Sequence, residues 1–251
     1  MTALTVGVTT ARDPACKRGL ATNIAASLAR NASISARVCV VDADPHALDV
    51  TTRMGLRGPA IEDYARPQTP TIGSLAQLHS PAMAVVPCRG GSEARVHLGA
   101  ESALPLLRDG FDVVICDLPG GPSGPGSVIG GRLEVLDWLI LAVTPEPNAV
   151  ASAAHFLEHF DTARDRGDVG AVQLAVVCTG DESSAPLSTD EVEAALGRAI
   201  VGRVPQLWGR AEPNLGFGPA LAIPDLDDAV HDVFMDFVRG RRAQRTSLAT
   251  L

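Results

Sequence analysis

The chain has 251 residues and a formal net charge of −8, and 46% of its residues are hydrophobic, 20% charged and 4% aromatic. This composition excludes a disordered chain and suits one large globular domain. The acidic excess argues against a protein that coats DNA over its whole surface, because such binding needs Lys and Arg to neutralise phosphates. No basic segment followed by an apolar one opens the sequence, and no run reaches about 18 apolar residues. We therefore expect a cytoplasmic protein.

Short apolar runs alternate with amphipathic stretches along the chain. In order, the sequence predicts a strand at 4–8, a helix at 20–30, strands at 37–41 and 84–86, a helix at 100–108, strands at 112–116 and 138–143, a helix at 149–164, a strand at 173–178, a helix at 189–196 and a strand at 199–204. Continuous apolar strands separated by helices are typical of a parallel sheet covered on both faces. The predicted fold class is α/β, doubly wound with a mostly parallel sheet.

The domain is expected to span residues 1–238, and a basic, flexible tail is expected at 239–251. An amphipathic helix over 227–239 precedes this tail. Its apolar face could dock on an anionic membrane, but its aspartates favour packing on the sheet. Peripheral contact with the inner face of the membrane stays open as an alternative.

The segment TTARDPACKRG, residues 9–19, joins the first predicted strand to the first predicted helix. A P-loop would cradle phosphates at this place. Such loops use glycines to take positive φ and to bring N–H groups against phosphate. Here a single glycine, Gly19, stands at the end of the segment. The sequence therefore raises the question whether the segment still binds phosphate.

Four segments occur in a fixed order: NIAASLAR at 23–30, ARVCVVDADPHALDVTTRMGL at 36–56, FDVVICDLPGG at 111–121 and LILAVTPEPNAVASAAHFLEHF at 139–160. Together they resemble the ParA/MinD superfamily of deviant Walker-A ATPases, which includes the CpaE-like proteins. VGRVPQ, at 201–206, resembles a late turn of the same family. The resemblance covers most of the chain and implies the P-loop NTPase fold. It also implies that the Gly/Pro-rich stretch 117–131 occupies the family's second switch segment.

By this resemblance, Lys17 takes the place of the Walker-A lysine. Arg12 takes the place of the signature lysine, which in the family reaches the phosphates of a dimer partner. Arg18 replaces the threonine whose hydroxyl would ligate Mg²⁺, and an arginine cannot act as a metal ligand. We count all three residues among the nucleotide-binding positions. ATP or ADP with Mg²⁺ is the implied cofactor, and the loss of the threonine is expected to impair its binding.

Three further substitutions replace the loop glycines of the family, by Asp13, Pro14 and Cys16. Proline lacks an N–H and fixes φ near −65°, so one phosphate donor is lost. A carboxylate about 4 Å from a phosphate oxygen is repelled by roughly 4 kcal/mol at an effective dielectric near 20. These changes predict a degenerate Walker-A loop.

The acidic residues of the family are retained. The resemblance implies that Asp44 positions the attacking water, that Asp117 supports Mg²⁺ indirectly and that Asp42 belongs to the nucleotide-binding set. A simpler alternative is that Asp-x-Asp-Pro caps the following helix, since Asp is a good N-cap and Pro suits a first turn. Thr179 stands where the family often has an asparagine that reads adenine.

The cysteines and histidines give weaker evidence of a functional site. The five cysteines form no C-x-x-C pair, and we expect no metal or redox role for them. Three of them, Cys39, Cys116 and Cys178, fall inside apolar strand-like runs, where a thiol is usually a small buried hydrophobic group. His155 and His159 form an i, i+4 pair on one helix face, but no third ligand stands near them in sequence. We therefore expect no zinc site there.

The sequence as a whole predicts a degenerate MinD/ParA-like protein. The leading hypothesis is a pseudo-ATPase that acts as a scaffold or regulator in cell division, chromosome positioning or envelope and secretion machinery. It would form a homodimer, or a heterodimer with a paralogue. The alternative is an active or slow ATPase with a nucleotide-controlled switch between monomer and dimer.

Overall fold

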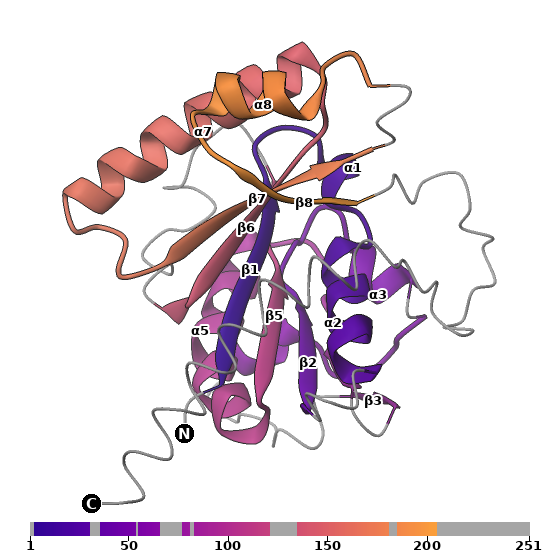
Figure 1. Ribbon diagram of the computed structural model, residues 1–251. Coiled ribbons are helices and arrows are strands. Elements are labelled where there is room, and N and C mark those ends of the chain that lie inside the picture. Colours follow the sequence, from indigo (N-terminus) through magenta and orange to yellow (C-terminus); the bar gives the residue numbers. More distant parts are fainter. Residues whose placement is uncertain are drawn as a thin grey trace, which may run out of the picture.

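The computed structural model describes residues 3–30, 36–53, 55–65, 77–80, 83–120, 135–180 and 185–204. Within these residues lies one sheet of eight strands in the order β3-β4-β2-β5-β1-β6-β7-β8. In Figure 1, β1 runs through the middle of this sheet, between β5 and β6. The strands are β1 (Leu4–Thr10), β2 (Val38–Asp42), β3 (Gln77–Ser80), β4 (Met83–Val86), β5 (Val113–Asp117), β6 (Trp138–Val143), β7 (Gln173–Thr179) and β8 (Ile200–Val204). All neighbouring pairs are parallel except β3 and β4, which are antiparallel. The predicted mostly parallel sheet is confirmed.

Helices cover both faces of this sheet. They are α1 (Pro14–Lys17), α2 (Leu20–Arg30), α3 (Asp49–Arg53), the 3₁₀ helix η1 (Ile61–Ala65), α5 (Glu93–Gly110), α7 (Pro147–Asp165) and α8 (Thr189–Leu196). Alternate strand residues divide the core, because successive side chains point to opposite faces. In β6, Ile140 packs in the cluster that contains α2, whereas Leu139 and Leu141 pack with α7 and α8. In β5, Val114 packs in the cluster that contains α5 and η1.

The long, periodic elements follow the predicted bounds closely. The strand at 138–143 and the helices at 20–30 and 189–196 have the predicted ends. Both ends of α8 have clear local causes: Ser188 and Glu191 form a capping box at its start, and Gly197, with φ 61°, closes it at its end.

Short elements were missed by the sequence analysis. It predicted no separate element for α1, η1 or β3, each of which spans only four or five residues. Such lengths are too short to show a hydrophobic period. Helix α5 also begins seven residues before the predicted start at residue 100. The glycine within it, Gly99, fits there because its backbone lies directly against that of Ile61 in η1.

Candidate functional site

The carboxyl ends of β1, β2 and β5 meet at one edge of the sheet, where ligands of doubly wound folds bind. Asp42 is the last residue of β2 and Asp117 the last of β5, and the two are direct neighbours in the parallel register. Asp117 is also in register with Val8 of β1. Asp44 follows two residues after Asp42, and Lys17 ends α1, which follows β1. The strand order therefore brings four of the predicted site residues together.

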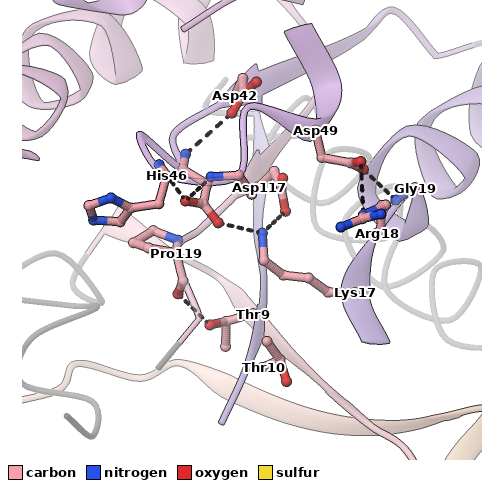
Figure 2. Close-up of polar contacts among 12 residues, drawn as sticks. Thr9, Thr10, Lys17, Arg18, Gly19, Asp42, His46, Asp49, Asp117 and Pro119 are labelled. Carbon is pink, nitrogen blue, oxygen red and sulfur yellow. Dashed lines mark hydrogen bonds and ion pairs between the residues drawn. The ribbon is translucent and has the colours of Figure 1, made fainter. Parts of the chain in front are cut away.

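Lys17 lies between two carboxylates at this edge. Its Nζ atom is 2.6 Å from Asp117 Oδ1 and 3.0 Å from Asp44 Oδ2. Only 1% of the Lys17 side chain is exposed. Figure 2 shows the ammonium group directed at Asp117. The ammonium is thus enclosed by acidic groups of its own chain.

The two aspartates of the Asp-x-Asp-Pro segment also organise the backbone that follows them. Asp44 Oδ1 accepts the N–H groups of His46 at 3.0 Å and Ala47 at 3.1 Å. Asp42 Oδ2 accepts the N–H group of Thr51 at 2.9 Å and its hydroxyl at 2.7 Å. The carboxylates therefore hold the turn before α3 and the helix itself, while Asp44 also pairs with Lys17. These contacts are consistent with the alternative in which Asp-x-Asp-Pro supports the following helix. The helix α3 begins at Asp49, however, which is too far along the chain for either aspartate to be its N-cap.

One ammonium group faces three buried carboxyl groups in this cluster. Burial raises the pKa of Asp117 to about 7, and the pair with Lys17 only partly opposes this effect. Burial likewise raises the pKa of Asp42 to about 6. Burial acts against ionisation of Asp44 too, but Lys17 and the backbone N–H donors outweigh it and lower the pKa of that carboxyl. Lys17 and Asp44 therefore form a charged pair, whereas burial works against the ionisation of Asp117 and Asp42.

These pKa shifts predict a pH-dependent stability. Because the pKa values of Asp42 and Asp117 are raised, the folded state keeps protons above about pH 4 that the unfolded state releases. The free energy of unfolding should therefore fall as the pH rises from 5 to 8. Urea unfolding at several pH values tests this, with Asp117→Asn as the variant whose pH slope should be flatter. A free energy of unfolding that increases over this window would contradict the prediction.

The segment that resembles a P-loop forms a helical turn. Pro14 is the first residue of α1, a position that needs no N–H, and the N–H of Cys16 donates to Asp13 O at 3.0 Å. The Cys16 thiol is buried, donates to the same carbonyl at 3.0 Å and lies 2.8 Å from Thr10 Oγ1. Burial raises the pKa of this thiol to about 11, so it stays neutral. The Cys16 thiol thus fastens the segment to Thr10, the last residue of β1.

Three predicted site residues lie apart from the carboxylate cluster. Arg18 has 46% of its side chain exposed, and its Nε atom lies 3.7 Å from Asp49 Oδ1 in α3, as Figure 2 shows. Arg12 is exposed in the segment between β1 and α1. Thr179 is buried at the end of β7, where its hydroxyl lies 3.5 Å from Val143 O.

Sequence reasoning missed Asp49 and Thr51. Asp49 accepts the N–H of Gly19 at 2.6 Å in addition to its contact with Arg18. Thr51 links the cluster to the end of β4, because its Oγ1 atom donates to Asp42 and accepts the N–H of Cys88 at 2.8 Å. An acidic residue in the first turn of a helix was the only available signal for Asp49.

In this arrangement carboxylates of the chain already engage two groups that could contact a phosphate, the Lys17 ammonium and the Gly19 N–H. Among the described residues, no group of three or more His, Cys, Asp or Glu side chains could hold a metal ion. A phosphate could reach Lys17 only after the two ion pairs had opened.

Comparison with solved structures identifies the fold. MinD, the cell-division ATPase of Pyrococcus furiosus, matches with a TM-score of 0.72 at 14% sequence identity, over 93% of this chain and 99% of that one. MinD of Aquifex aeolicus, in its complex with MinC, gives 0.70 at 17% identity over 92% and 96%. Cobyrinic acid a,c-diamide synthase of Mycobacterium smegmatis, solved with ADP and magnesium, gives 0.70 at 16% identity over 95% and 96%.

These similarities confirm the predicted fold, which is that of the ParA/MinD family ATPases. Identities of this size establish the fold alone. No protein-family model matches the chain, and no curated protein sequence matches it significantly.

Some predictions lie outside the described residues. These are the helix over 227–239, the tail at 239–251 and most of the stretch 117–131. None of the helices in the described part is long and apolar enough to cross a bilayer.

Proposed function

We propose that this protein is a pseudo-ATPase with the MinD/ParA-like fold, which acts in the cytoplasm as a dimeric scaffold or regulator. Cell division, chromosome positioning, and envelope or secretion machinery are the processes in which we place it. The observation that carries the proposal is the pairing of Lys17 with Asp44 and Asp117, with only 1% of the lysine side chain exposed.

The charges of the site explain why this pairing disfavours nucleotide. A phosphate that reached Lys17 would displace two carboxylates from the ammonium and then lie beside them. Each ionised carboxylate about 4 Å from a phosphate oxygen opposes binding by roughly 4 kcal/mol at an effective dielectric near 20. Mg²⁺ would offset part of this repulsion, but Arg18 stands in place of the metal-binding threonine and lies near Asp49.

The fold is consistent with a role that depends on protein contacts. Fold and function are separable, so a ParA/MinD scaffold can keep its interaction surfaces after its chemistry is lost. The Aquifex aeolicus relative was solved together with a protein partner, MinC. By analogy, we infer that this chain also works through a protein partner and as a homodimer or heterodimer.

One observation favours the alternative, an active or slow ATPase. Lys17, Asp42, Asp44 and Asp117 lie together at the sheet edge where ligands of this fold class bind. The lowered pKa of Asp44 keeps a carboxylate ionised there. If the ion pairs of Lys17 opened, this carboxylate could orient a water, and Arg12 could contact the phosphates of a second subunit.

Calorimetric titration with ATP·Mg²⁺ distinguishes the two functions. We expect no binding tighter than about 100 μM, which corresponds to roughly −5.5 kcal/mol. The matched variant restores the loop with Asp13→Gly, Pro14→Gly, Cys16→Gly and Arg18→Thr, and its affinity for ATP·Mg²⁺ should increase, because phosphate donors and a metal ligand return.

The oligomeric state and turnover complete this test. Dimers in light scattering without nucleotide would support the scaffold. Tight binding by the unmodified chain, with turnover that disappears in Asp44→Ala, would instead establish the ATPase and refute the pseudo-enzyme.

A further inference from the structure

Two histidines lie one turn apart on the exposed side of α7. The Nε2 atoms of His155 and His159 form a hydrogen bond of 2.9 Å, in which one nitrogen donates its proton to the other, and their rings are nearly perpendicular, with an interplanar angle of 86°. A metal ion that binds both nitrogens replaces this shared proton. Both residues are exposed, and 63% of the His155 side chain is accessible. The pair is therefore open to an ion from solvent.

The backbone beneath this pair is well anchored. Helix α7 runs without interruption for 19 residues, and the pair lies in its central part. Phe156, Leu157 and Phe160, which lie between or beside the histidines in sequence, are buried in the core. The two Cα atoms are thus held in fixed relation, and an ion that binds both rings does not have to order the chain.

The distance between the two nitrogens restricts the kind of ion. Imidazole nitrogens bind divalent transition-metal ions at about 2.1 Å. Two such nitrogens 2.9 Å apart therefore subtend an angle of about 90° at a shared ion. This is the angle between neighbouring ligands in tetragonal or octahedral coordination. Tetrahedral Zn²⁺ would need the nitrogens to move apart to about 3.4 Å. The geometry suits Cu²⁺ and Ni²⁺ better than Zn²⁺.

A neighbouring carboxylate favours the required tautomer. Glu158 Oε2 lies 3.7 Å from Nδ1 of His155, the ring nitrogen that does not face His159. A carboxylate on this side favours a proton on Nδ1 and leaves the lone pair of Nε2 for a metal.

We propose that His155 and His159 form a two-imidazole chelate for Cu²⁺ or Ni²⁺, with water in the remaining coordination positions. The sequence analysis expected no zinc site because a third ligand is missing. In the part of the chain that the structure describes, no group of three or more His, Cys, Asp or Glu side chains could hold a metal ion. Two preorganised nitrogens suffice for a tetragonal ion whose other positions are hydrated.

Titration with NiCl₂ tests the chelate, because Ni²⁺ does not oxidise the five thiols of the chain. The full chain at pH 7.5 should bind one Ni²⁺ ion, and binding should be lost near pH 5, where protons compete for imidazole nitrogens. His155→Ala and His159→Ala should each weaken binding at least about tenfold, because the second ligand acts at high effective concentration. Cu²⁺ should bind more tightly than Ni²⁺ in a parallel titration.

His97→Ala is the matched control, because His97 also lies on a long helix and is followed by an acidic residue, Glu101, four positions later. Its affinity for Ni²⁺ should equal that of the unmodified chain. Circular dichroism verifies that the exposed substitutions leave the fold intact. Two results would overturn the proposal. One is an equal affinity for Ni²⁺ in the unmodified chain and both α7 variants. The other is the absence of binding at pH 7.5 and about 1 mM Ni²⁺, a concentration that would detect a dissociation constant on the order of 1 mM.

Discussion

Replacing Lys17 with methionine should lower the free energy of unfolding by about 3 to 5 kcal/mol, even in the absence of nucleotide. The substitution keeps an unbranched side chain that is one heavy atom shorter, but it removes the ammonium that pairs with Asp44 and Asp117. Both carboxyl groups stay buried and lose the charge that compensates them. Urea unfolding at pH 7.5 measures the loss.

A double variant separates the ion pair from the packing of the side chain. In Lys17→Met with Asp117→Leu, the nearer of the two carboxyl partners is gone as well, and part of the lost stability should return. A loss below about 1 kcal/mol in Lys17→Met would mean that the pairs contribute little to the folded state. That result would also weaken the proposed function, because an ammonium held so weakly could turn to phosphate.

The strands of the sheet could be predicted because each is a continuous buried apolar run. Val38–Asp42 and Val113–Asp117 are buried at every position, so an apolar run alone marks them. The carboxyl groups that end these strands, Asp42 and Asp117, could be named from the sequence for the same reason. That the two lie side by side could not be predicted, because it depends on the register between two strands whose paired residues are 75 positions apart in the sequence.

The environment of Lys17 was beyond sequence reasoning. The resemblance placed this residue in a phosphate-binding position, which suggests an ammonium open to ligand. In the structure it is enclosed, because α1 turns the side chain toward strand ends that come from distant parts of the chain. Arg18, the next residue, extends instead toward Asp49 in α3. The helical turn of α1 therefore decides that Lys17, and not its neighbour Arg18, faces the acidic cluster.

That turn depends on residues that sequence reasoning counted only as losses. Pro14 was expected to remove a phosphate donor, yet it occupies the first position of α1, where no N–H is required. Cys16 was expected only to replace a glycine, yet its thiol contacts Thr10 and the carbonyl of Asp13. Pro14 and Cys16, which replace glycines of a phosphate-binding loop, thus stabilise the helical turn that directs Lys17 to the carboxylates. The loss of the phosphate donors and the enclosure of Lys17 therefore have the same cause.

Gly99→Ala should destabilise the protein by about 3 kcal/mol, although alanine is the better helix former. Gly99 lies inside α5, and a Cβ atom there would be 2.0 Å from the carbonyl oxygen of Ile61 and 2.7 Å from its carbonyl carbon. Both atoms belong to the backbone of η1, so no side-chain rotation relieves the clash. The helix and η1 would have to separate, and the buried side chains between them, such as Tyr64, would lose contacts.

Urea unfolding again measures this effect, and Leu98→Ala provides a control on the same helix. Leu98 is 51% exposed, so its truncation should change the free energy of unfolding by about 0.5 kcal/mol or less. A Gly99→Ala variant that is as stable as the parent chain would show that α5 does not lie against η1 as described. Gly99→Ala adds a methyl group on the packed side of α5. Leu98→Ala removes apolar atoms from its exposed side. A large difference between them would therefore locate the tight contact at the Gly99 backbone.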